Sequence, residues 1–208
     1  MIEVNPDTGA IRLDDDGLAD LLDVGSDGRD PAMMARLAEA GLHPALKTLA
    51  DPVVTLELVV AGTSVLRHSV RVDLERAVVV LGVRPGLHHV LVMPPAHLAA
   101  GLVRMTHMRP RRTGERLERP YPADQLDTLV AADVGARAAA LERAGADFAW
   151  HLGVSSPGGD RHEVTAINGP DGLFLANPMN DALRPVSNTT AYRIFSTVLQ
   201  AQPLELTH

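Results

Sequence analysis

Two stretches of the chain, "LVMPPAHLAAGLVRM" (residues 91–105) and "LRPVSNTTAYRIFSTVL" (residues 183–199), follow the same plan. Each joins the apolar end of a strand to a proline, a residue suited to cap a helix, and an amphipathic helix. A plan that occurs twice in one chain indicates an internal repeat. We therefore expect a block of strands before each stretch, closed in both cases by a helix.

Strand signals fill the region before each of these stretches. Four runs rich in β-branched residues start at Val53, Ser64, Arg76 and Leu87, and four more start at Asp147, Arg161, Gly172 and Asp181. Turn residues separate the runs. Each block predicts a four-strand antiparallel meander, so both halves of the chain have the order helix, four strands, closing helix.

Shorter elements are expected outside the two meanders. The first 13 residues predict a small hairpin, and the acidic run at residues 14–16 is placed to cap a short helix. A further helix should begin after Asp30 with Pro31 in its first position and end at Gly41. Residues 123–145 are helical in character, and Gly135 marks a break in them.

These elements predict an α+β fold in which pseudo-duplicated antiparallel β-meanders form a sheet covered by helices, with quasi-two-fold symmetry. The whole chain, residues 1–208, is expected to be one domain with a first half at 1–108 and a second half at 123–208. Residues 109–122 are charged, contain three prolines and lack apolar periodicity, so they are the expected linker. Both closing helices are expected to cover one face of the sheet and to leave the other face available.

Composition narrows the classes of protein. With 208 residues and 46% hydrophobic content the chain can bury a large core, and without cysteine it has no disulfide or thiolate chemistry. The start of the chain is acidic and no apolar run approaches the ~18 residues that a membrane span needs, which predicts a cytoplasmic protein without membrane contact. The net charge of -7 and the 3% aromatic content argue against binding to nucleic acid.

Catalytic and metal-binding motifs are not found. His88, His89, His97 and His107 are close in sequence, but neighbours in a strand point to opposite faces, so His88 and His89 cannot hold one ion. No carboxylate accompanies His97 at helical spacing. The glycine-containing turns do not lead into a helix as a phosphate loop does, so no metal, cofactor or catalytic residue is predicted.

The basic run "RPRR" at residues 109–112 stands out in this acidic chain. It is either a solvated linker or a patch that recognises an acidic partner. Methionines beside arginines at a helix end suit an adaptable protein-binding surface, although methionine more commonly fills a core. The expected partner-binding residues are Met105, Met108, Arg111, Arg112 and Leu129.

Two segments of the chain also resemble a known family. Residues 36–83 place a short helix and "LADP" immediately before a meander, and residues 162–200 follow the order strand, acidic-glycine turn, strand, proline, final helix. This pattern resembles the EspG family of actinobacterial ESX, or type VII, secretion-associated chaperones, although this chain is shorter than typical members. The resemblance implies a quasi-two-fold α+β fold and a cytosolic chaperone, not an enzyme, that keeps helical substrates of the PE/PPE type soluble.

Two other classes of function stay open at this stage. One is an enzyme of unknown class with a pocket built from His68, His151 or His162 and a carboxylate. The other is a structural protein that associates with itself, because exposed sheet edges make a homodimer plausible.

Overall fold

The fold is seen in a computed structural model that describes residues 2–4, 11–22, 35, 38–39, 41–108, 117–159 and 161–200. The chain forms two compact units. Unit 1 comprises Met1–Glu57, Leu66–Leu98 and Ser155–Asp160, and unit 2 comprises Leu58–Val65, Ala99–Val154 and Arg161–His208. Each unit draws on several segments of the chain.

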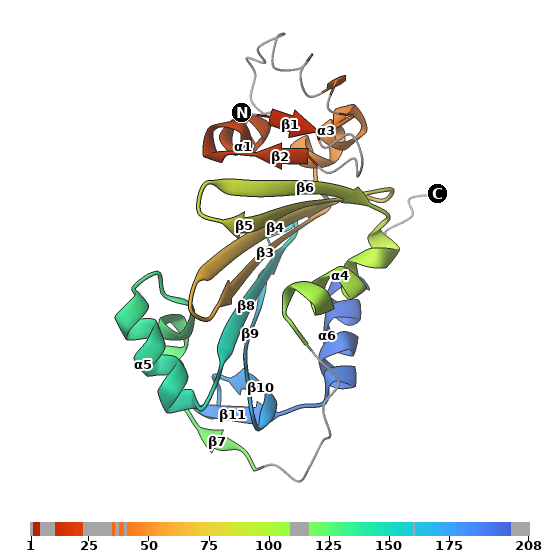
Figure 1. The fold of residues 1–208 in the computed structure, drawn as a ribbon. Helices are drawn as coiled ribbons and strands as arrows, with labels where there is room; N and C mark the ends of the chain where they lie inside the picture. Colours follow the sequence, from red (N-terminus) through yellow and green to blue (C-terminus); the bar gives the residue numbers. More distant parts are fainter. Residues whose placement is uncertain are drawn as a thin grey trace. The chain divides into compact units, whose positions relative to one another are not determined.

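Unit 1 is built on an antiparallel set of strands that can be followed in Figure 1. Its elements are β1 (Ile2–Val4), β2 (Ile11–Leu13), α1 (Asp15–Leu22), α3 (His43–Ala50), β3 (Val54–Ala61), β4 (Val65–Val72), β5 (Ala77–Arg84) and β6 (Leu87–Met93). The strand order is β1-β2-β6-β5-β4-β3. The amino-terminal hairpin therefore joins the meander beside β6, with Ile11 opposite Val90 and Leu13 opposite His88.

Two helices cover one face of these strands. Alternate residues of a strand point to the same face, so Val78 and Val80 of β5 share a face with Val90 of β6, which lies opposite Val80. α1 and α3 place their leucines against this face. The resulting core contains Ile11, Leu13, Leu21, Leu42, Ala45, Leu46, Leu49, Val78, Val80 and Val90. Burial of this apolar surface is the main source of stability for unit 1.

Unit 2 combines the second meander with most of the remaining helices. Its elements are α4 (Leu98–Met105), β7 (Arg119–Pro120), η3 (Ala123–Val130), α5 (Val134–Ala144), β8 (Phe148–Ser155), β9 (Arg161–Gly169), β10 (Gly172–Asn177), β11 (Ala182–Pro185) and α6 (Asn188–Gln200). A single 3-10 turn, η2 (Pro95–His97), precedes α4. The strand order is β3-β8-β9-β10-β11-β7, and β3 supplies residues to both units.

Capping residues set the start of α6 and both ends of α5 in unit 2. Ser187 caps α6, because its side-chain oxygen accepts the Thr190 N–H at 3.0 Å. Asp133 caps α5 by accepting the Ala136 N–H at 2.7 Å, and Gly145 ends α5 in the left-handed region at φ 63°. The break between the helical segments lies at residues 131–133, so its expected place at Gly135 is wrong. Asp133 is the cause, since an N-cap fixes where α5 starts.

The α+β fold with antiparallel strands covered by helices is confirmed. Each of the eight meander strands begins within one residue of its predicted start, and the order helix, four strands, closing helix occurs in both halves of the chain. The expected helix from Asp30 to Gly41 lies largely outside the described residues. Residues 119–122 of the expected linker are structured: β7 pairs with β11, and Tyr121 is buried in the core of unit 2.

Close packing of two backbones at Gly82 generates a first prediction. A β-carbon at Gly82, beside the irregularity between β5 and β6, would lie 2.5 Å from the main-chain oxygen of Arg67. Gly82→Ala should lower the free energy of unfolding by about 1–3 kcal/mol, because this atom belongs to a backbone that cannot rotate away. Urea unfolding monitored by circular dichroism measures the change.

The matched control is Gly101→Ala in α4, where the nearest atom to an added β-carbon is the Met105 methyl at 3.8 Å. This variant should gain about 0.5–1 kcal/mol, because alanine favours a helix interior over glycine. Equal effects of the two substitutions would contradict the packing at Gly82.

Asp73 generates a second prediction, because it holds the β4–β5 turn to α3. Its carboxylate accepts hydrogen bonds from the Thr48 hydroxyl at 2.5 Å and from the Glu75 and Arg76 N–H groups at 2.7 Å each. Burial raises the pKa of Asp73, but these hydrogen bonds outweigh burial and hold the pKa of this carboxyl below its ordinary value. The stabilisation is therefore complete above the unfolded pKa and is lost as the pH falls through the folded pKa.

Asp73→Asn should accordingly reduce the loss of stability on acidification, measured as urea midpoints from pH 6 to pH 2.5. Asp51→Asn removes another carboxylate, an exposed one, and is the control. If the urea midpoints of Asp73→Asn and the wild type fall equally between pH 6 and pH 2.5, Asp73 does not stabilise the fold in this way.

Candidate functional site

One face of the unit 2 strands is covered by η3 and α5 (Figure 1). Ala149 of β8 and Ile167 of β9 lie on this face and are buried with Leu141 and Ala144 of α5. The full cluster contains Tyr121, Leu129, Ala140, Leu141, Ala144, Ala149, Ile167, Phe174 and Leu183. This face is therefore part of the core over much of its length.

The opposite face of β8 is covered as well. Trp150 follows Ala149 and points to the other side, where its ring centroid lies 5.4 Å from that of Phe195 on α6. Phe148 is on the same side as Trp150, and its ring meets His107, just after α4, at 5.8 Å edge to face. The two closing helices thus share a face, as expected, but the expectation that the other face stays available is wrong for unit 2. Its η3 and α5 cover that face.

Met108 is among the expected partner-binding residues, and the structure buries it. It is 7% exposed and stands in the Schellman motif that ends α4. In this motif the Met108 N–H donates to Val103 at 3.2 Å and the His107 N–H donates to Arg104 at 3.2 Å. The residue at the Met108 position commonly makes an apolar contact with the helix. Met108 is therefore not part of an exposed surface in this structure.

Leu129 is also buried, with no exposed surface, inside the η3–α5 cluster. Its helical spacing in the sequence indicated an apolar face but not what that face packs against. Met105 is half-buried and remains accessible on α4. Arg111 and Arg112 lie outside the described residues. Of the five expected residues, Met105 is the one described here that offers a surface to a partner.

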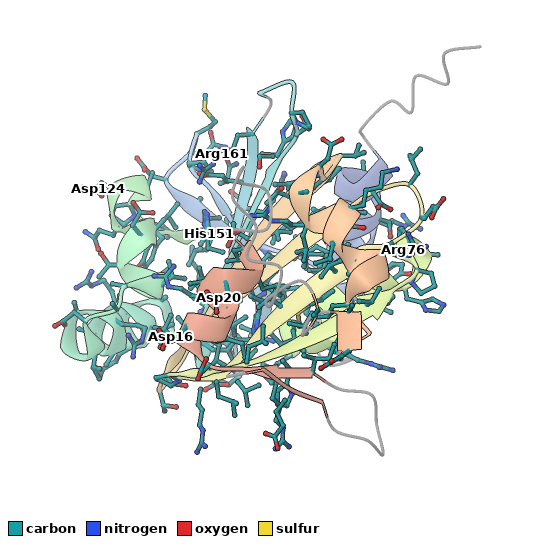
Figure 2. All side chains as sticks on the ribbon, turned by 90° about the horizontal axis from the view of Figure 1, so that it is seen from above. Asp16, Asp20, Arg76, Asp124, His151 and Arg161 are labelled. Atoms are coloured by element: carbon teal, nitrogen blue, oxygen red, sulfur yellow. The ribbon has the colours of Figure 1, made fainter. Side chains whose placement is uncertain are left out.

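A polar strip continues the η3–α5 face of β8 and β9 beyond the core. We define it as His151, Thr165, Glu163 and Arg161. His151 and Thr165 share a hydrogen bond of 2.8 Å between Nδ1 and Oγ1, and Arg161 Nε donates to Glu163 Oε1 at 2.6 Å. His151 and Arg161 can be followed in Figure 2, with Glu163 and Arg161 exposed and His151 half-buried. The strip presents paired polar groups on an otherwise apolar sheet face.

The described end of the expected linker, residues 117–122, is held by charged and aromatic contacts within unit 2. Arg119 lies over the Phe174 ring at 4.5 Å, pairs with Asp171 and reaches the Ala144 carbonyl at the end of α5. Burial raises the pKa of Tyr121, with Arg143 acting in the opposite direction. These contacts explain why part of the expected linker is fixed to the unit.

The histidines occupy separate environments. His88 Nε2 lies 2.8 Å from Asp15 Oδ1 on α1, a pair that sequence spacing could not reveal because 73 residues separate its members. His68 is buried in β4, His151 bonds Thr165, and His162 is exposed on β9. Among the described residues, no group of three or more His, Asp or Glu side chains is arranged to hold a metal ion.

The acidic run at residues 14–16 acts as expected at the start of α1. The Asp14 carboxylate accepts the Gly17 N–H at 2.8 Å, which is an N-cap contact. Asp16 and Asp20 carry exposed carboxylates on the same helix (Figure 2). No helix among the described residues is both long enough and apolar enough to span a membrane.

Sequence reasoning missed Arg137. It lies in the alanine-rich part of α5, where a single arginine indicates a solvent-facing side chain, yet it is 2% exposed. Its guanidinium donates to main-chain carbonyls, among them Gly62 at 2.9 Å and Ala131 at 2.6 Å. The sequence contains no signal for this role, since the acceptors are main-chain atoms.

Comparison with known proteins supports the fold. No protein-family model matches the sequence, and no curated protein is similar to it in sequence. Among solved structures the chain has the fold of a type VII secretion chaperone. One match is to the structure of the Mycobacterium tuberculosis chaperone EspG5 in complex with a PE25–PPE41 dimer, at a TM-score of 0.53 and 13% identity. It covers 94% of this chain and 97% of the matched chain, and at this identity it shows the fold alone.

The different positions of Leu129 and Met105 give a third prediction. Leu129→Ala should lower the free energy of unfolding by about 2–5 kcal/mol, because it leaves a cavity in a core cluster. Met105→Ala, at a half-buried site, should cost less than half as much. Thermal and urea unfolding measure both changes. If Met105→Ala proves the more destabilising substitution, the assignment of the two residues to core and surface is overturned.

Proposed function

We propose that this chain is a cytoplasmic protein-binding module that acts as a chaperone in type VII secretion. The observation that carries the proposal is the similarity in fold to EspG5 over 94% of the chain. That chaperone is solved with a PE25–PPE41 dimer, so a helical secretion substrate of the PE/PPE type is the partner we propose here. A chaperone of this kind requires a shaped surface and no reacting group.

We place the partner surface of unit 2 on the polar strip. Both faces of β8 are used for packing near Ala149 and Trp150, so a partner has no broad apolar face of β8 to bind there. His151, Glu163 and Arg161 continue the same face with groups that can form hydrogen bonds and ion pairs. Such groups contribute to selection between partners more than to raw affinity. The half-exposed Met105 of α4 is a second candidate contact.

Co-expression tests the proposal and gives a fourth prediction. The full chain is co-expressed with each protein encoded beside its own gene, and the products are analysed by size exclusion with light scattering. We expect a stable complex with a helical partner. Separate elution of every neighbour contradicts the proposed function, and a homodimer of the chain alone would favour the self-associating alternative.

The surface is tested separately with charge reversal. Glu163→Lys should weaken the complex at least tenfold, about 1.4 kcal/mol, because it breaks the pair with Arg161 and changes the charge of the strip. Asp124→Lys makes the same change of charge on η3 and is the matched control. If both variants bind the partner equally well, the proposed function stands, but the polar strip is not the partner surface.

A further inference from the structure

The guanidinium of Arg137 is enclosed by main-chain carbonyls from two loops. The first loop is the β3–β4 turn, where Nε donates to Gly62 at 2.9 Å and Nη2 donates to Thr63 at 3.3 Å. The second is the η3–α5 connection, where Nη1 donates to Ala131 at 2.6 Å and Ala132 at 3.1 Å, with Asp133 at 3.5 Å. All of these residues belong to unit 2.

The main-chain carbonyls compensate for the burial of the Arg137 guanidinium. A buried charge without partners is costly, and an arginine has five N–H donors to satisfy. No ion pair to Arg137 is found among the described residues, so the dipoles of these carbonyls offset the loss of water around the cation. Moving any of them away would leave a donor of a buried cation without an acceptor.

The two loops are remote in sequence. Gly62 and Arg137 are 75 residues apart, while Ala131 lies only six residues before Arg137. Both loops reach solvent, since Thr63, Ser64, Ala132 and Asp133 are exposed. Directly after the second loop, Val134 is 65% exposed. A molecule that bound either loop would therefore contact a residue whose carbonyl accepts a hydrogen bond from Arg137, or the residue next to it.

We propose that Arg137 couples the β3–β4 turn to the η3–α5 connection, so that the two loops open and close as one conformational unit. The planar guanidinium carries donors on three nitrogens at fixed angles and can bond both loops at once. A lysine ammonium has a single nitrogen and cannot reproduce this geometry. The coupling is independent of the proposed function, because it follows from contacts within unit 2.

Hydrogen exchange of the full chain, measured by mass spectrometry or NMR, gives a fifth prediction. In Arg137→Lys, the amides of residues 62–64 and of residues 131–133 should both exchange at least about fivefold faster than in the wild type. The control is Arg143→Lys on the same helix, whose exposed guanidinium bonds the Gln125 side chain; it should leave both loops unchanged. Faster exchange in one loop alone, or in neither, overturns the proposal.

A perturbation of one loop separates coupling from a local effect. Thr63→Gly loosens the β3–β4 turn and leaves Arg137 in place. Exchange at residues 131–133 should then rise at least about twofold in the wild-type background and show no additional rise in the Arg137→Lys background. Additive effects in the double variant, or no change at residues 131–133 in Thr63→Gly, overturn the coupling even if each variant remains folded.

Discussion

The burial of β8 on both faces is the constraint on which the rest of unit 2 depends. Ala149 and Trp150 are neighbours, and both are fully buried, so each side of the strand needs its own cover. η3 and α5 supply one side, and α6 with the end of α4 supplies the other. Near Ala149 and Trp150, β8 therefore has no uncovered face, and the partner that we propose would bind where these covers stop.

Main-chain carbonyls, as well as apolar contacts, hold α5 in place. The end of α5 is closed by the Schellman motif at Gly145, and Arg119 reaches the Ala144 carbonyl from the neighbouring β7 while lying over Phe174. Arg137 binds the start of the same helix to the β3–β4 turn. A cation near the last turn interacts favourably with the helix dipole, whereas Arg137 is fixed by hydrogen bonds. The position of α5 is thus set at both ends by arginines.

Local chemistry explains what the sequence could predict. The meander strands are predictable because proline, glycine and aspartate separate runs of β-branched residues. Ser187 and Asn188 are both suited to cap α6, and the structure shows that the Ser187 hydroxyl accepts the main-chain N–H. Contacts between distant residues could not be predicted this way. The spacing of Leu129 shows that it faces something apolar, but a core and a partner surface give the same periodicity. The pairing of His88 with Asp15 and the carbonyls around Arg137 depend on tertiary structure alone.

The fold and the binding specificity of a protein depend on different residues. This chain and EspG5 share 13% identity over 94% of this chain, so the likeness between them is one of fold and not of particular side chains. Binding specificity resides in side chains at a surface, so it can change while the covered sheet is kept. A preformed surface loses less conformational freedom on binding than a mobile one. In unit 2, internal hydrogen bonds hold both the paired groups of the polar strip and the loops around Arg137.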